Sequence, residues 1–146
     1  MNSIEYKMIE NLKALKNDYG VYEIKCEFEA EGTRMEELMR LKDVTSAVGL
    51  PIILKIGGVE AVTDIYNALA IGVRAIIAPM AETPFALSKF LNIIETLVPK
   101  DNAADLDFAF NMETITCHKN LDAMLALPKL NLLQGMTVGR VDFTGS

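Results

Sequence analysis

Five short apolar segments recur along the chain, and polar or turn-forming residues bound each of them. They are residues 21–28, 51–56, 75–80, 106–112 and 132–138. Continuous apolar runs of this length are typical of strands that are buried on both faces of a parallel sheet. The pattern therefore predicts five strands at the spacing of successive β–α units.

Apolar residues at helical spacing fill the segments between these strands. Thr83 and Pro84 form a typical N-cap and first helical residue, Pro99 marks the end of that helix, and Gly72 is a typical C-cap. The helical stripes are Ile4, Met8, Leu12 and Leu15 at the N-terminus; Met35, Leu38, Met39 and Leu41; Val62, Ile65, Tyr66 and Leu69; Phe85, Phe90, Ile93, Ile94 and Leu97; and Leu121, Met124 and Leu125.

Strict alternation of strand and helix predicts a parallel sheet with right-handed crossovers, which closes either as a doubly wound sheet or as a (β/α)8 barrel. A doubly wound nucleotide-binding sheet favours a glycine-rich turn after its first strand. Here that strand is followed by Glu27, Glu29 and Glu31, whose carboxylates repel phosphate. We therefore expect residues 1–146 to form a single, partial TIM-type barrel of about five units, because a complete barrel takes about 250 residues. Further sequence or an oligomer is expected to cover the remaining gap.

Composition narrows the class of partner. A net charge of −6 argues against nucleic acid, which needs clustered Lys and Arg. Cys26 and Cys117 have no metal-ligand spacing and lie in apolar surroundings, which favours buried thiols in a reducing compartment. The chain shows no signal pattern and no apolar run long enough to span a membrane, so we expect a cytoplasmic protein.

Charged residues stand where the predicted strands finish. They are Glu27 and Glu29, Lys55, Glu82, Glu113 and Asp142. In a barrel the carboxyl ends of all strands meet on one face, which carries the catalytic groups. A carboxylate buried there is costly unless it is paired or binds a cation, so the set as a whole favours a functional site.

Three segments carry a resemblance to a known family. They are Ala78-Pro79-Met80-Ala81-Glu82-Thr83, then Met112-Glu113-Thr114, then Val138-Gly139-Arg140-Val141-Asp142. This set resembles the metal-dependent 2-oxo-acid aldolases and the citrate lyase β-subunit, which share the phosphoenolpyruvate/pyruvate-type barrel. The resemblance implies a homo-oligomer in which Glu113 and Asp142 hold Mg²⁺ or Mn²⁺. The metal would act as a Lewis acid on a chelated 2-oxo acid and stabilise the enolate that forms when a C–C bond breaks.

The resemblance also implies roles for other residues. Lys55 stands where the family usually has an arginine for the keto oxygen, and the following Gly57 and Gly58 either bind a carboxylate or phosphate through backbone N–H groups or form a plain turn. Arg34 and Glu82 are further candidates for substrate binding. The first strand lacks the family's histidine, so acid–base work would fall to Glu29, Glu27 or metal-bound water, and His118 is expected at the surface.

The sequence thus predicts a lyase or aldolase that acts on a 2-oxo acid or related acyl substrate. Two alternatives stay open. One is a barrel that binds a phosphorylated sugar or phosphoenolpyruvate through Lys55 and the glycine turn. The other is a non-catalytic metabolite-binding or inactive barrel.

Overall fold

The computed structural model describes residues 1–28 and 30–146. Within these ranges strands and helices alternate along the chain. The elements are α1 (Ser3–Tyr19), β1 (Ile24–Glu27), α2 (Met35–Val48), β2 (Ile52–Lys55), α3 (Val62–Ile71), β3 (Ala75–Ala78), α4 (Pro84–Leu97), α5 (Lys100–Asp105), β4 (Asp107–Met112), α6 (Ile115–Leu125), the 3₁₀ turn η1 (Leu130–Leu132), β5 (Gly135–Val138) and α7 (Arg140–Gly145).

The strands of the described residues form one five-stranded sheet in the order β1-β2-β3-β4-β5, and every pairing is parallel. A doubly wound sheet reverses its strand order at a switch point, whereas a (β/α) barrel adds each new strand beside the previous one. The consecutive order therefore confirms the predicted partial TIM-type barrel.

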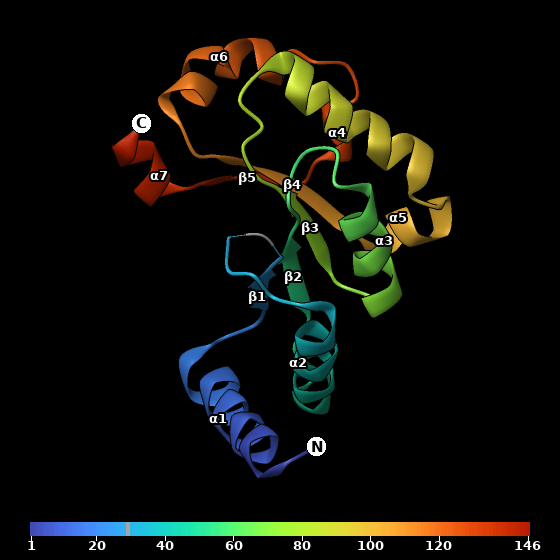
Figure 1. Cartoon of the computed structure of the whole chain (residues 1–146), viewed down its shortest axis with the longest axis vertical. Coiled ribbons are helices and arrows are strands. Elements are labelled where there is room, and N and C mark those ends of the chain that lie inside the picture. Colours follow the sequence, from blue (N-terminus) through green and yellow to red (C-terminus); the bar gives the residue numbers. More distant parts are fainter. Residues whose placement is uncertain (29) are drawn as a thin grey trace.

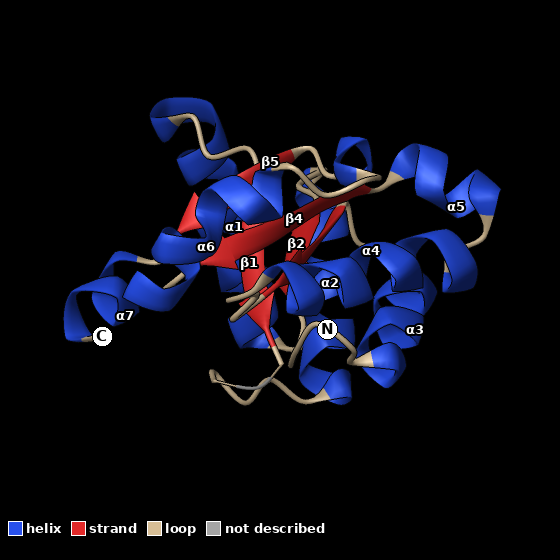
Figure 2. Cartoon of the chain, turned by 90° about the horizontal axis from the view of Figure 1, so that it is seen from above, coloured by secondary structure: helices blue, strands red, loops and turns tan. Residues whose placement is uncertain are grey.

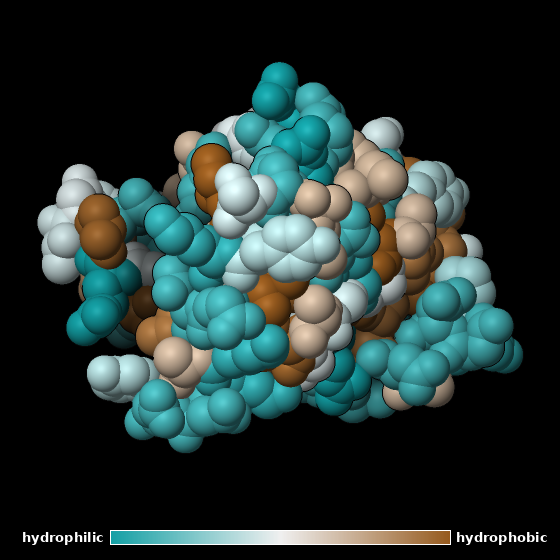
Figure 3. All heavy atoms as spheres, turned by 90° about the horizontal axis from the view of Figure 1, so that it is seen from below, coloured by the Kyte–Doolittle hydropathy of each residue, from teal (hydrophilic) through white to brown (hydrophobic). Residues whose placement is uncertain are grey.

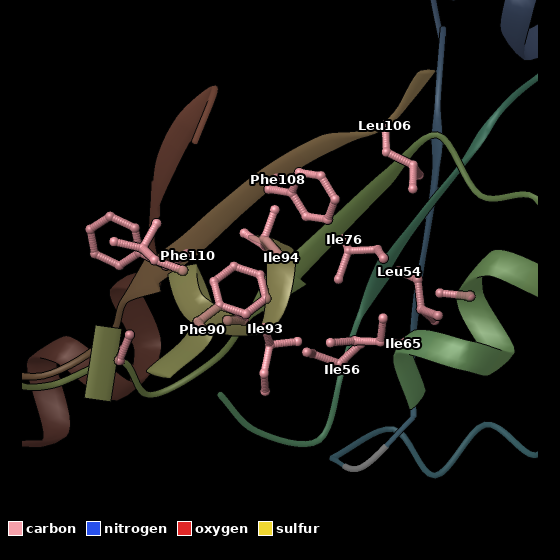
Figure 4. Packing of buried hydrophobic residues seen from close by; sticks show 14 of the residues in the cluster. Leu54, Ile56, Ile65, Ile76, Phe90, Ile93, Ile94, Leu106, Phe108 and Phe110 are labelled. Carbon is pink, nitrogen blue, oxygen red and sulfur yellow. The ribbon is translucent and has the colours of Figure 1, made fainter. Parts of the chain in front are cut away.

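The hydrophobic core lies between the sheet and its helices. Ile65 of α3 packs close to Leu54 and Ile56 of the second β–α unit (Figure 4). Phe90 of α4 meets Phe108 of β4 edge to face, with ring centroids 6.4 Å apart. Burial on this side of the sheet leaves its other face to side chains of a different kind.

The helices do not surround the sheet evenly. α3, α4 and α5 lie together beside the strands, as Figures 1 and 2 show from two directions. α1 lies at one end of the molecule and packs on α2, whereas α6 and α7 lie toward the other end (Figure 1). Lysines link successive units, since Lys16 donates to the carbonyls of Val48 and Gly49 where α2 ends, and Lys42 donates to the carbonyl of Gly72 where α3 ends.

The sequence predicted the presence of these elements better than their bounds. Each predicted strand is shorter in the structure, and the predicted strand at 132–138 begins at Gly135 because Leu130–Leu132 form a 3₁₀ turn. Two short helices, α5 and α7, were not predicted. The capping predictions for α3 and α4 are confirmed: Gly72 ends α3 with φ 69°, and the Thr83 hydroxyl accepts a hydrogen bond from the N–H of Ala86.

The surface is mostly polar, and apolar patches interrupt it on the face that Figure 3 shows. Both cysteines are buried, as expected. Burial raises the pKa of the Cys117 thiol, and the charges of Glu82 and Glu113 raise it further. Across the described residues, every helix is too short or too polar to cross a membrane.

Candidate functional site

The alternation of side chains along the strands separates the core from a polar cluster. Cys26, Leu54, Phe110 and Met112 belong to the core between sheet and helices. Because successive side chains of a strand point to opposite faces, their neighbours in sequence lie on the other, inner face of the sheet. These inner-face residues include Lys25 and Glu27 of β1, Lys55 of β2, and Asn111 of β4 with Glu113 directly after it.

An ion pair between neighbouring strands is the centre of this cluster. Glu27 and Lys55 are direct partners in the β1–β2 register. The Lys55 Nζ lies 2.6 Å from Oε1 of Glu27 and 3.6 Å from Oε1 of Glu113. One ammonium therefore lies between two carboxylates that come from strands far apart in the sequence. The prediction that strand ends bring Glu27, Lys55 and Glu113 together is consistent with this geometry.

Lys25 completes the cluster on the side of β1. Its Nζ donates to Oε2 of Glu27 at 3.2 Å, so each oxygen of that carboxylate faces its own lysine. The Lys25 side chain is 51% exposed, whereas that of Glu27 is 4% exposed. Sequence reasoning missed Lys25, although its position two residues before Glu27 places both side chains on one face of the strand.

Three separate segments fix Glu113. The backbone N–H of Met80 donates to Oε2 at 3.0 Å, and Nδ2 of Asn111 donates to Oε1 at 2.8 Å. Gly139 lies directly against the Glu113 side chain. Met80 has φ 49°, a backbone conformation that is rare for a residue with a side chain. Strain of this kind is expected only where the surrounding structure over-determines a conformation.

Asn111 was also missed by sequence reasoning. It is buried, and the carboxylate beside it requires that Nδ2 face Glu113, which directs Oδ1 elsewhere. Within the described residues Oδ1 has no hydrogen-bond partner. An orphan acceptor next to a held carboxylate is common at sites that bind a ligand or an ordered water.

The charges of the central ion pair stabilise one another. Burial works to raise the pKa of Glu27, but the hydrogen bonds and positive charges of Lys55 and Lys25 outweigh it and hold the pKa below its ordinary value. Burial works to lower the pKa of Lys55, and the hydrogen bond to Glu27 with the charges of Glu113 and Glu27 raises it instead. Both groups are therefore charged at neutral pH.

The two look-alike motifs at Glu82-Thr83 and Glu113-Thr114 differ in the structure. We expected both acids to point over the barrel mouth, but Oε1 of Glu82 accepts a hydrogen bond from the Thr114 hydroxyl at 2.7 Å. Asn120 of α6 also donates to the backbone carbonyl of Glu82. Glu82 thus links the segment after β3 to α6, and its proposed contact with substrate stays a prediction.

Other predicted substrate contacts lie away from the cluster. Arg34 precedes α2 and forms its ion pairs with Glu36 and Glu37. The N–H of Gly57 donates to Oδ2 of Asp64 at 2.7 Å, and the carbonyl of Gly58 accepts from Ala61.

The glycine segment therefore has the plain turn chemistry that was one of its two readings, and the phosphate alternative gains no support from it. Glu29 lies outside the described residues. His118 is exposed, as expected, and stacks edge to face with Phe143.

The predicted metal ligands differ in setting. Glu113 is buried, but Asp142 is exposed in the first turn of α7 and not at the end of a strand, as the sequence had suggested. Among residues 1–28 and 30–146, no group of three or more His, Cys, Asp or Glu side chains is arranged to hold a metal ion. Each Glu113 oxygen accepts one hydrogen bond and retains a second lone pair. The donors thus fit a hard cation that takes its other ligands from substrate and water.

Comparison with solved structures supports the fold. Citrate synthase SbnG matches with a TM-score of 0.77 at 16% identity, over 95% of this chain and 58% of that one. An HpcH/HpaI aldolase from Desulfitobacterium hafniense DCB-2 matches with a TM-score of 0.71 at 12% identity, over 92% of this chain and 59% of that one. An HpcH/HpaI aldolase/citrate lyase family protein from Burkholderia cenocepacia J2315 matches with a TM-score of 0.73 at 15% identity, over 100% of this chain and 72% of that one.

These likenesses establish the fold and not the activity, because the identities are low. Neither a family model nor a curated protein sequence matches the chain. The chain spans 58% and 59% of the first two structures. The resemblance to aldolase and citrate lyase barrels that the sequence predicted is confirmed at the level of the fold.

Proposed function

We propose that this aldolase-type fold serves a carbon–carbon lyase that acts on a 2-oxo acid. The observation that carries the proposal is the Lys55 ammonium, which lies 2.6 Å from Glu27 and 3.6 Å from Glu113 at the carboxyl ends of three strands. Carboxyl ends of parallel strands carry the active site in barrels of this kind. A cation fixed there is suited to bind an oxygen that gains negative charge during the reaction.

Lys55 would act as a charged donor and not as a nucleophile. A lysine that forms an imine must lose its proton first, and enzymes lower its pKa for that purpose. The pKa of Lys55 is raised by its carboxylate partners. Its ammonium can therefore donate a hydrogen bond to the keto oxygen and stabilise the charge that develops on that oxygen.

Glu113 and Asp142 are the residues that would hold a divalent cation, with Mg²⁺ or Mn²⁺ as the ions that such donors favour. When bound, the cation would draw electron density from the substrate's keto oxygen as a Lewis acid. Met80 and Asn111 contribute by fixing the orientation of the Glu113 carboxylate. Positioned ligands of this kind commonly change metal affinity when their supports are removed.

Proton transfer would not fall to Glu27 in its present setting. Two lysines lower its pKa, so it is a weaker proton acceptor than an ordinary glutamate. We therefore assign proton transfer to Glu29 or to water, in line with the candidates that the sequence offered. Glu27 is left with a different role, which its contact with Lys55 indicates.

The proposal is tested by ligand-dependent stability. Mg²⁺ or Mn²⁺ should raise the melting temperature, and oxalate, a mimic of a 2-oxo acid enolate, should raise it further when the metal is present. Glu113→Gln should abolish both shifts. Glu10→Gln is the matched control, because Glu10 is exposed on α1 and pairs only with Lys13 in the described structure. Wild-type protein that responds to neither metal nor oxalate would sink the proposal.

A further inference from the structure

We propose that Glu27 is a positioning residue that fixes the direction of the Lys55 ammonium, with Lys25 holding Glu27 in turn. The inference rests on the proposed function, since it concerns how Lys55 meets the ligand. Glu27 itself would touch no substrate. Its contacts with two lysines, and not its basicity, would account for a buried carboxylate at the end of β1.

Lysine needs such support because of its chemistry. Its ammonium is a compact charge at the end of a flexible four-carbon stem, and three rotatable donors surround it. By itself the group has no preferred direction toward a ligand. The Lys55 side chain is 13% exposed, so a defined position is available to it only if partners hold the ammonium there.

The register of the sheet provides one such partner. Glu27 stands directly beside Lys55 in the β1–β2 ladder, so the backbone fixes the separation of their Cα atoms. Oε1 of Glu27 lies 2.6 Å from Nζ, and Oε1 of Glu113 lies 3.6 Å from it. Two of the three ammonium donors can thus face carboxylates, which leaves one donor for a ligand oxygen. The ligand would meet this donor in a single direction.

Glu27 would hold the ammonium only if its own carboxylate cannot rotate freely. Its side chain is 4% exposed, and Lys25 donates to Oε2 at 3.2 Å while Lys55 faces Oε1. Glu31 lies 3.9 Å from the same Lys25 ammonium and helps to keep it near the cluster. The order of support therefore runs from Lys25 to Glu27 to Lys55.

Charge and position predict opposite results for the same substitution, which makes the inference testable. Removal of the Glu27 charge should attract an anion more strongly, because a like charge is lost from the site. Removal of the Glu27 contact should weaken binding, because Lys55 loses its direction. The affinity for oxalate in saturating Mg²⁺, measured by calorimetry, distinguishes the two. Glu27→Gln should weaken binding by roughly tenfold, the range of a charge-assisted hydrogen bond.

The same substitution in the Lys55→Met background provides the control. With no ammonium to position, only the effect of charge remains, so Glu27→Gln should there tighten binding. Glu27→Asp is the second variant, since it keeps the charge and shortens the reach by one methylene. It should weaken oxalate binding when Lys55 is present and leave it unchanged in the Lys55→Met background. Melting curves of each variant show whether it is folded.

Each other outcome overturns the inference in a recognisable way. Tighter binding in both backgrounds would show that Glu27 acts by charge alone. Weaker binding in both would show a direct contact with the ligand or a role in the fold. Wild-type protein that binds no oxalate would remove the proposed function, and the positioning role with it, whereas tight wild-type binding that Glu27→Asp leaves intact would remove only the positioning role.

Discussion

Gly139 leaves the space that Glu113 occupies. A Cβ atom at position 139 would lie 2.5 Å from Cγ of Glu113 and 3.1 Å from its Oε1, well inside van der Waals contact. The N–H of Gly139 also pairs with the carbonyl of Met112, so the β5 backbone cannot move away without a break in the sheet. The absence of a side chain at this position is therefore a condition for the conformation of Glu113.

Substitution of this glycine should displace the carboxylate. We expect Gly139→Ala to lower the free energy of unfolding by about 1–3 kcal/mol, the usual cost of overpacking a buried site. Gly135→Ala is the matched control on the same strand, because a Cβ there meets nothing within 4 Å. Chemical denaturation of both variants checks the prediction. Equal stability of the two would show that Glu113 moves aside at little cost.

The Asn111 amide gives a second prediction. Asn111→Asp replaces the Nδ2 donor, 2.8 Å from Glu113, by a second carboxylate of nearly the same shape. Two buried carboxylates at that distance cannot both ionise without a large cost, so the variant should be destabilised by about 3 kcal/mol or more at neutral pH. Protonation removes the repulsion, and the difference from the wild type should shrink as the pH falls. A difference in unfolding free energy that does not change with pH would contradict this explanation.

The two N-capping threonines permit a comparison within one protein. Thr83 accepts a hydrogen bond from Ala86, whereas Thr114 accepts one from Cys117 and also donates to Glu82. Loss of a cap costs about 1 kcal/mol, and loss of the additional bond to a charged group costs about 1.5–3 kcal/mol. Thr114→Ala should therefore destabilise the protein more than Thr83→Ala. The reverse order in thermal unfolding would show that the Glu82–Thr114 contact contributes little.

The lowered pKa of Glu27 predicts a dependence of stability on pH. A carboxyl whose pKa is lower in the folded chain stabilises the fold above the ordinary pKa, here 4.5, and loses that contribution as the pH falls through the folded value. The stability difference between the wild type and Glu27→Gln should thus be constant near neutral pH and shrink below about pH 4.5. Urea unfolding at a series of pH values measures it. A difference that grows on acidification would contradict the lowered pKa.

The strands were predictable because burial on both faces leaves a clear apolar signature. Residues 75–78 of β3 are buried throughout, and the apolar run at 75–80 identified that strand. Strand bounds were less predictable, because the apolar segment at 132–138 contains both a 3₁₀ turn and β5. Periodicity alone does not separate two short apolar elements that follow each other directly.

The candidate site was predictable where a charged residue closes an apolar strand, as at Glu27, Lys55 and Glu113. Its supporting residues followed a subtler rule. Lys25 and Asn111 each stand two positions before an acid, in Lys25-Cys26-Glu27 and Asn111-Met112-Glu113, so each shares a strand face with its partner. That alternation was available in the sequence. The N–H of Met80 was not, because a backbone donor leaves no trace in the residue type.

The consecutive order of the sheet has a consequence for how the protein is made. Each strand pairs with the strand that follows it in the chain, from Ile24 beside Ile52 to Ala109 beside Gly135. No strand must wait for a partner from the distant end, so each loop to be closed is short and its entropic cost is modest. The sheet can therefore grow one strand at a time as the polypeptide leaves the ribosome, and every new β–α unit finds its docking edge already in place.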